Sequence, residues 1–167
     1  MGITEASIKD IDSREMANGL RNSRYHILTD DEIETIKKDI RDIQADIHVF
    51  KFNKGQRTSY SDAFDEVRVR GDVLPNLNST HPRDLMSARA VLAHEYYGHR
   101  PYRNAVNPLP YGCWNDEFRA SYMAAKNAPG LSDDDRKYLI LDALERAKSA
   151  GVSIVNNSLI RRVLYGY

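Results

Sequence analysis

The chain has 167 residues, a length that suits one domain with a sizeable buried core. Its 24 basic and 24 acidic side chains give a formal net charge of zero, so composition offers no case for nucleic-acid or membrane binding. The only cysteine, Cys113, rules out an intramolecular disulfide.

The chain shows no targeting or membrane-spanning segment. Its first residues lack the apolar core of a signal peptide, and no run of about twenty apolar residues occurs. We therefore expect a cytoplasmic protein, or an effector delivered as part of a larger system. A single domain is expected over residues 1–167.

The N-terminal third is expected to be mainly helical. Residues 4–22 have a weak helical pattern, and Thr29 is a candidate N-cap for a stronger amphipathic helix. An apolar stripe at helical spacing marks that second helix. The stripe consists of Ile33, Ile36, Ile40, Ile43 and Ile47.

Two short strands are expected in the middle of the chain. Residues 48–53 alternate between apolar and polar side chains, as a half-buried strand does. Residues 54–56 read as a turn, and residues 67–70 form a second alternating segment that ends at Gly71.

A nearly apolar helix is expected from Pro82, because proline suits the first turn of a helix and leucines and alanines follow it. His81, beside this proline, fits a helix cap better than a metal ligand. The apolar composition predicts that the helix is buried on most sides.

The hexapeptide at residues 94–99, His-Glu-Tyr-Tyr-Gly-His, closes this apolar segment. Two imidazoles around a glutamate are typical of zinc hydrolases, in which the histidines hold one zinc ion and the glutamate is the general base for an activated water. His94 and His99 are therefore candidate ligands and Glu95 the candidate catalytic base. The alternative is that both histidines are ordinary helix residues, one packed and one exposed.

The spacing of five residues makes a specific structural demand. Positions five apart on an α-helix differ by about 140°, too far for His94 and His99 to meet at one ion. A single π-type bulge lengthens one turn and restores the overlap. Gly98, which has no Cβ, tolerates the distortion, so we predict one bulge near it.

A third ligand is expected from residues 114–125, which suit a helix returning antiparallel to the first. Glu117 lies eighteen positions after His99, and small residues at 120, 121 and 124 share its face. These would let the two helices approach closely. The alternative is that Glu117 is only an N-terminal carboxylate stabilised by the helix dipole. Two more helices are expected, one capped by Ser132 and one over residues 156–165.

Here the chain resembles the gluzincin metallopeptidases, and most closely the dipeptidyl peptidase III family. Residues 94–99 match that family's His-Glu-x-x-Gly-His motif, and residues 116–121 resemble its Glu-Glu-x-Arg-Ala-Glu motif. The resemblance implies zinc binding by His94, His99 and Glu117, with Glu95 as general base. It also implies that Asp116 orients a ligand histidine.

The resemblance covers about residues 82–125 and has two departures. Ser121 stands where the family has a glutamate, so that outer contact is lost or replaced, and the interval between the motifs is much shorter. A mainly helical, zincin-like α+β fold is implied, with a small antiparallel sheet beside the metal-binding active-site helix.

In zincin-like folds an edge strand often binds the peptide substrate by strand addition. The strand over residues 66–70 is the candidate for this role. The alternative is an ordinary solvated face, on which Arg68 and Arg70 protect an edge from aggregation.

Hydrolysis also needs a group that stabilises the oxyanion. Arg100 and Tyr102 directly follow the motif and are the favoured candidates, and Tyr111 and the C-terminal tyrosines are alternatives. Cys113 could bind metal or react, but a small buried side chain is the more ordinary role for it.

Two functions remain open at this point. The leading hypothesis is a zinc metallopeptidase that cleaves a peptide or protein substrate, either alone or as a toxin-like effector domain. The competing hypothesis is a non-catalytic module in which zinc ties two helices together. Such a closed site would need a fourth protein ligand, for which Asp116, Cys113 or His81 are the candidates.

Overall fold

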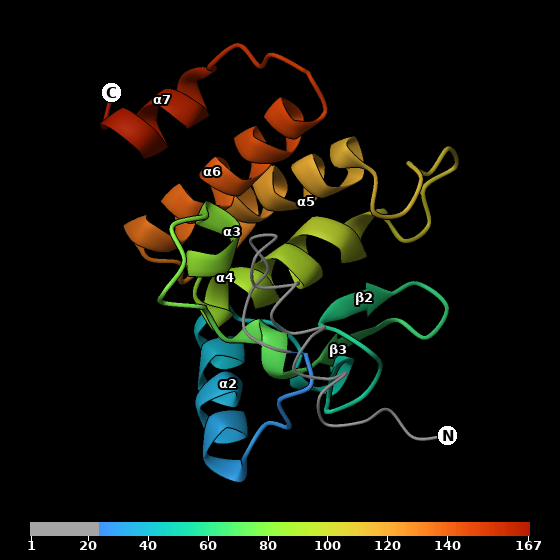
Figure 1. Cartoon of the computed structure of the whole chain (residues 1–167). Helices are drawn as coiled ribbons and strands as arrows, with labels where there is room; N and C mark the ends of the chain where they lie inside the picture. The colour runs from blue at the N-terminus through green and yellow to red at the C-terminus, as the bar shows by residue number, and fades with distance from the viewer. Residues whose placement is uncertain (1–23) are drawn as a thin grey trace, which may run out of the picture.

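The computed structural model describes residues 24–167, and the helix expected over residues 4–22 lies outside them. Helices make up most of this part, with one three-stranded sheet beside them (Figure 1). The expected α+β class is therefore confirmed. No helix among the described residues combines the length and the apolar character needed to cross a membrane.

Helix α2 (Asp30–Asp42) begins at the predicted cap. The Thr29 hydroxyl accepts a hydrogen bond from the Glu32 amide at 3.2 Å, and the Glu32 carboxylate accepts one from the Thr29 amide at 2.9 Å. This is a complete capping box. Ile36 and Ile40 of the predicted stripe are buried, and α2 packs them toward α4.

The sheet is mixed, which corrects the expectation of an antiparallel sheet. Its strands β1 (Phe50–Phe52), β2 (Ser59–Ser61) and β3 (Glu66–Val69) lie in the order β1-β3-β2. β2 and β3 form an antiparallel hairpin, whereas β1 runs parallel to β3. β2 pairs with one side of β3, so β1 pairs with the other side. β1 runs in the same direction as β3, which makes this second pairing parallel.

β3 is the central strand, so the expectation that residues 66–70 form an edge is wrong. Val67 and Val69 on its inner face are fully buried in the core. β2, which the sequence analysis missed, is an edge strand instead. Its Ser-Tyr-Ser sequence contains a single apolar residue, too little alternation to indicate a strand. Two 3₁₀ turns flank the sheet, η1 (Ile47–Val49) and η2 (Gly71–Val73).

The single helix expected from Pro82 is broken in two. α3 (Pro82–Leu85) starts as predicted with His81 as N-cap, and α4 (Ala88–Ala93) starts anew at the N-cap Ser87. The Ser87 hydroxyl accepts a hydrogen bond from the Ala90 amide at 3.1 Å and donates one to Asp135 at 2.6 Å. The second bond connects the break to α6 (Asp133–Ser149), a tertiary contact that local periodicity does not reveal.

The predicted bulge is present. α4 continues into a π-helical turn, η3 (His94–His99), which covers the whole hexapeptide. A 3₁₀ turn, η4 (Arg100–Tyr102), ends this segment.

Gly98 lets this turn approach α5 (Trp114–Asn127). A Cβ built on Gly98 would lie 2.6 Å from the Ala120 Cα and 2.7 Å from its carbonyl carbon, distances that real Cβ atoms essentially never show. Ala120, Ser121 and Ala124 are fully buried on the facing side of α5. The predicted small-residue contact between the two helices is therefore confirmed.

Helices α5 and α6 pack together behind η3, and α7 (Ser158–Tyr165) packs on α6 (Figure 1). The predicted cap of α6 is confirmed, because Ser132 and Asp135 form a capping box. The predicted C-terminal helix is confirmed as well, with Asn157 as its N-cap.

An ion pair connects the β2–β3 hairpin to η4. Arg100 binds the Asp65 carboxylate through Nε at 2.9 Å and Nη2 at 3.1 Å, and the Tyr60 hydroxyl donates to the same carboxylate at 2.6 Å. These bonds, led by the one from Arg100, lower the pKa of Asp65 to about 2. The carboxylate therefore stabilises the fold only while it is ionised.

We expect Gly98→Ala to destabilise the protein by about 1–3 kcal/mol, because the added methyl group overlaps backbone atoms that cannot move aside locally. Helix propensity alone predicts the opposite sign, a gain of roughly 0.5–1 kcal/mol. Urea unfolding of the purified variant decides between the two. A variant as stable as wild type would contradict the close approach.

We expect Asp65→Asn to remove part of the stability of the protein at neutral pH and little of it below pH 2. The reason is that a depressed pKa stabilises the fold above the unfolded-state value of about 4 and loses this contribution as pH falls toward 2. Asparagine suits the left-handed backbone of Asp65, whose φ is 46°. Thermal unfolding of both proteins between pH 2 and 6 measures the difference. A constant difference across that range would contradict the assignment.

Candidate metal centre

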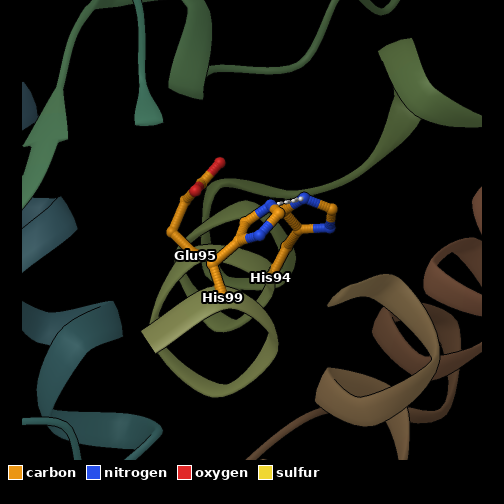
Figure 2. Close-up of side chains that lie close together, drawn as sticks. All are labelled: His94, Glu95 and His99. Atoms are coloured by element: carbon orange, nitrogen blue, oxygen red, sulfur yellow. Dashed lines mark hydrogen bonds between the residues drawn. The ribbon is translucent and has the colours of Figure 1, made fainter. Parts of the chain in front are cut away.

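Three donor atoms from two helices converge on one point. His94 Nε2 lies 3.2 Å from His99 Nε2 and 3.0 Å from Glu117 Oε2, and the third distance, from His99 Nε2 to Glu117 Oε2, is 3.7 Å. The two imidazoles meet at their Nε2 atoms (Figure 2). The structure thus brings together all three residues that the sequence analysis took as ligands.

These distances fit zinc. In a tetrahedral site with bonds of about 2.0–2.1 Å, neighbouring donor atoms lie about 3.3 Å apart. The three observed separations bracket that value without further movement of the side chains. Two imidazoles and one carboxylate are also a donor set that catalytic zinc sites use.

The burial of these groups makes the site suitable for a cation. His94 and His99 are only 5% and 9% exposed, and Glu117 is only partly accessible, so water solvates the three donors poorly. Buried lone pairs that face one another are unfavourable unless a positive charge lies between them. A bound cation would supply that charge.

A buried serine sets the tautomer of His94. The Ser121 hydroxyl donates its one proton to Asp142 Oδ2 at 2.6 Å, so its oxygen accepts the hydrogen bond from His94 Nδ1 at 2.8 Å. The proton of His94 is then on Nδ1, and the Nε2 lone pair is available to a metal. Asp142 thus supports His94 through Ser121.

Two arginines keep Asp142 ionised. Arg146 Nε binds Asp142 Oδ2 at 3.0 Å, and Arg83 Nε binds Asp142 Oδ1 at 3.2 Å. Burial by itself raises the pKa of Asp142, but Arg146, His94 and Arg83 outweigh it and hold the pKa below its usual value. The carboxylate therefore stays an acceptor for Ser121.

Asp116 lies behind the second histidine, as the resemblance implied. Its Oδ1 is 3.7 Å from His99 Nδ1, on the side of the ring away from Glu117 and His94. Burial lowers the pKa of His99, but Asp116 and Glu117 outweigh it and raise the pKa to about 10.

Glu117 is held as a carboxylate. Burial raises its pKa, but the two histidines and Arg146 lower it well below the usual range. Arg146 Nη1 lies 3.3 Å from Glu117 Oε2, so one arginine touches both this carboxylate and that of Asp142.

Glu95 projects from the same π turn beside the histidines (Figure 2). Its carboxylate lies within 4.8 Å of ligand atoms of His94 and His99, and the residue is 8% exposed. Burial raises the pKa of Glu95, and the neighbouring histidines only partly oppose this. In the described part of the chain no group donates a hydrogen bond to Glu95, so the carboxylate is available to a ligand.

A cavity of about 210 Å³ opens onto these groups. Its wall combines residues from the sheet region, the helices and the loop before α5. Besides the metal-centre residues His94, Glu95, His99 and Glu117, it is lined by Arg24, Arg57, Thr58, Asp72, Arg83, Met86, Val91, Tyr111 and Arg146.

The two favoured oxyanion candidates are not among the lining residues. Arg100 binds Asp65 and lies over the Tyr96 ring, and the Tyr102 ring stacks on Arg119 at 3.8 Å. Arg100 and Tyr102 directly follow the motif in sequence, but they belong to η4, whose side chains do not line the cavity.

The suggested fourth ligands are also occupied elsewhere. His81 caps α3, Cys113 Sγ contacts Asn115, and Asp116 faces the Nδ1 side of His99. Asp116 is the nearest of the three, with a carboxylate oxygen within 4.8 Å of ligand atoms of His99 and Glu117. Because it faces Nδ1 of His99 and not the Nε2 atoms, a cation held by His94, His99 and Glu117 would keep one coordination position for a ligand from outside.

The sequence analysis missed the supporting residues Asp142 and Arg146. An aspartate inside the apolar run Leu139–Leu144 was a usable signal, because a carboxylate rarely lies among buried residues without a partner. Arg146 follows it at the four-residue spacing of a helical ion pair.

Comparison with known proteins assigns no family to the chain. No protein-family model, no curated protein and no solved structure matches it. The case for a metal centre therefore rests on the donor atoms and the residues that orient them.

We expect Ser121→Ala to weaken zinc binding about 10- to 100-fold, because His94 loses the partner that fixes its tautomer. Competition with a zinc chelator measures the affinity. Ser149→Ala, at an exposed site on α6, is the matched control and is expected to bind zinc like wild type. Equal affinities in all three proteins would contradict the role of Ser121.

Proposed function

We propose that the protein is a zinc-dependent hydrolase, most specifically a peptidase, with Glu95 as its general base. The observation that carries the proposal is the convergence of His94 Nε2, His99 Nε2 and Glu117 Oε2 beside a buried glutamate at the cavity. A purely structural site has no use for that glutamate. The motif resemblance to gluzincin peptidases supports the same assignment.

The residues divide the chemistry among them. Zinc, when bound, supplies a Lewis acid that polarises a carbonyl group and lowers the pKa of water. Glu95 accepts the proton of the attacking water and then passes it to the leaving amine. Burial raises the pKa of Glu95 above that of an ordinary carboxyl group, and a more basic carboxylate accepts a proton more readily.

Two cavity residues replace Arg100 and Tyr102 as candidates for stabilising the oxyanion. Arg146 lines the cavity and lies beside the ligand Glu117. Tyr111 also lines it, with its ring centre 6.4 Å from that of His99. Both offer hydrogen-bond donors near the place where a scissile carbonyl would lie.

The exposed edge of β2 is the better candidate for binding a peptide backbone. It contacts η3, and its outer side has no partner strand among the described residues. Thr58, directly before β2, lines the cavity. A peptide added along β2 would thus pass the metal centre, a role for which residues 66–70 were one of two alternatives in the sequence analysis.

We expect Glu95→Gln to retain zinc and to lose peptide cleavage by at least about 100-fold, because the amide cannot accept the proton. Zinc content and cleavage of a mixed peptide library measure the two effects. Glu34→Gln, at a side chain that is 69% exposed on α2, is the matched control.

Two results would contradict the proposal. Equal cleavage by wild type and Glu95→Gln would rule out the assigned base. A protein that unfolds when zinc is removed, but cleaves no peptide in either form, would instead support the non-catalytic module.

A further inference from the structure

Positively charged side chains dominate the cavity beside the metal centre. Four arginines line it, at positions 24, 57, 83 and 146, against three carboxylates, at positions 72, 95 and 117. A divalent cation would add two further positive charges. In a cavity with low-dielectric walls, such an excess favours an anionic ligand.

Apart from Glu95, the carboxylates at or next to this cavity already have partners. Arg83 and Arg146 pair with Asp142, and Arg146 also touches Glu117. Asp72 accepts hydrogen bonds from the Thr58 amide at 2.9 Å and from its hydroxyl at 2.6 Å. Asp142 and Glu117 are thus paired with arginines, and among the described residues none of the lining carboxylates forms an ion pair with Arg57.

Arg57 differs from Arg83 and Arg146. It has no carboxylate partner in the described part of the chain, and it lines the cavity together with Tyr111. Tyr111 in turn lies beside the ring of His99. The side chain of Arg57 is exposed, and it lines the same cavity as the three candidate metal ligands.

The size of the cavity limits what the arginine can meet there. A volume of about 210 Å³ is below the roughly 300–1,000 Å³ of pockets that enclose drug-sized ligands. It suits the end of a peptide or one short side chain. Arginine binds carboxylates with two parallel hydrogen bonds, which fixes position as well as charge.

We propose that the cavity selects substrates bearing a carboxylate close to the scissile bond, and that Arg57 binds that carboxylate. The proposal rests on the proposed hydrolase function and adds its substrate class. The carboxylate has two sources, the C-terminus of a peptide or an aspartate or glutamate side chain.

The test measures binding without turnover. Zinc-loaded Glu95→Gln protein is titrated in a calorimeter with acetyl-Ala-Ala and with its C-terminal amide. A second pair, acetyl-Asp-Ala amide and acetyl-Asn-Ala amide, places the carboxylate on a side chain. We expect one carboxylate probe to bind about tenfold or more tightly than its neutral partner, and the pair that shows this identifies the source.

The same titrations are repeated with two double variants of the Glu95→Gln protein. One also carries Arg57→Gln, and the control carries Arg41→Gln at an exposed position of α2. Arg57→Gln is expected to abolish the preference, and Arg41→Gln to leave it intact. A preference that survives Arg57→Gln would overturn the proposal, because the metal or another group would then hold the carboxylate. The absence of any preference would overturn it as well.

Cleavage assays with the wild-type protein distinguish a failure of the carboxylate site from a failure of the proposed hydrolase function. Cleavage of neutral and carboxylate probes alike, unaffected by Arg57→Gln, would leave the hydrolase assignment standing and refute the substrate class. Arg57-dependent binding without cleavage would support the carboxylate site and refute the hydrolase.

Discussion

Two histidines five residues apart can share one ion only where the helix between them is widened. Here a π turn from His94 to His99 provides that widening. The turn packs directly on the backbone of α5 at Gly98, and the same approach brings Glu117, in the first turn of α5, to the two imidazoles. The missing Cβ at Gly98 thus permits the close approach that brings the third donor to the motif.

Around these donors the protein buries several charges, and those of Glu117, Asp142 and Arg146 are paired with one another. Removing a charge from water is costly unless it is paired and hydrogen-bonded. Arg146 joins the carboxylates of Glu117 and Asp142, and Asp142 holds the serine that orients His94. These polar contacts connect helices α5 and α6 in addition to their apolar packing.

Local features of the sequence predicted much of this arrangement. The motif, the π turn, Glu117 and the caps at Thr29 and Ser132 all depend on residues close together in the chain, where spacing determines geometry. The structure confirmed the predicted π turn and both caps, and it brought His94, His99 and Glu117 together.

What the sequence did not predict depends on contacts between distant segments. The helix break at Ser87 involves Asp135, and Asp142 reaches Ser121 across a helix pair. The position of β3 in the centre of the sheet depends on a strand, β2, that is too short and polar to recognise. Arg100 was chosen for its nearness in sequence, but its side chain binds Asp65 instead.

The central claim is that two imidazoles and one carboxylate hold a zinc ion with one position left open. A crystal structure of the zinc-loaded protein tests it most directly. The geometry predicts one ion bound by His94, His99 and Glu117, with bonds of about 2.0–2.2 Å, and a fourth ligand that does not come from the protein. Four protein ligands around the ion, or an ion bound without Glu117, would contradict the account.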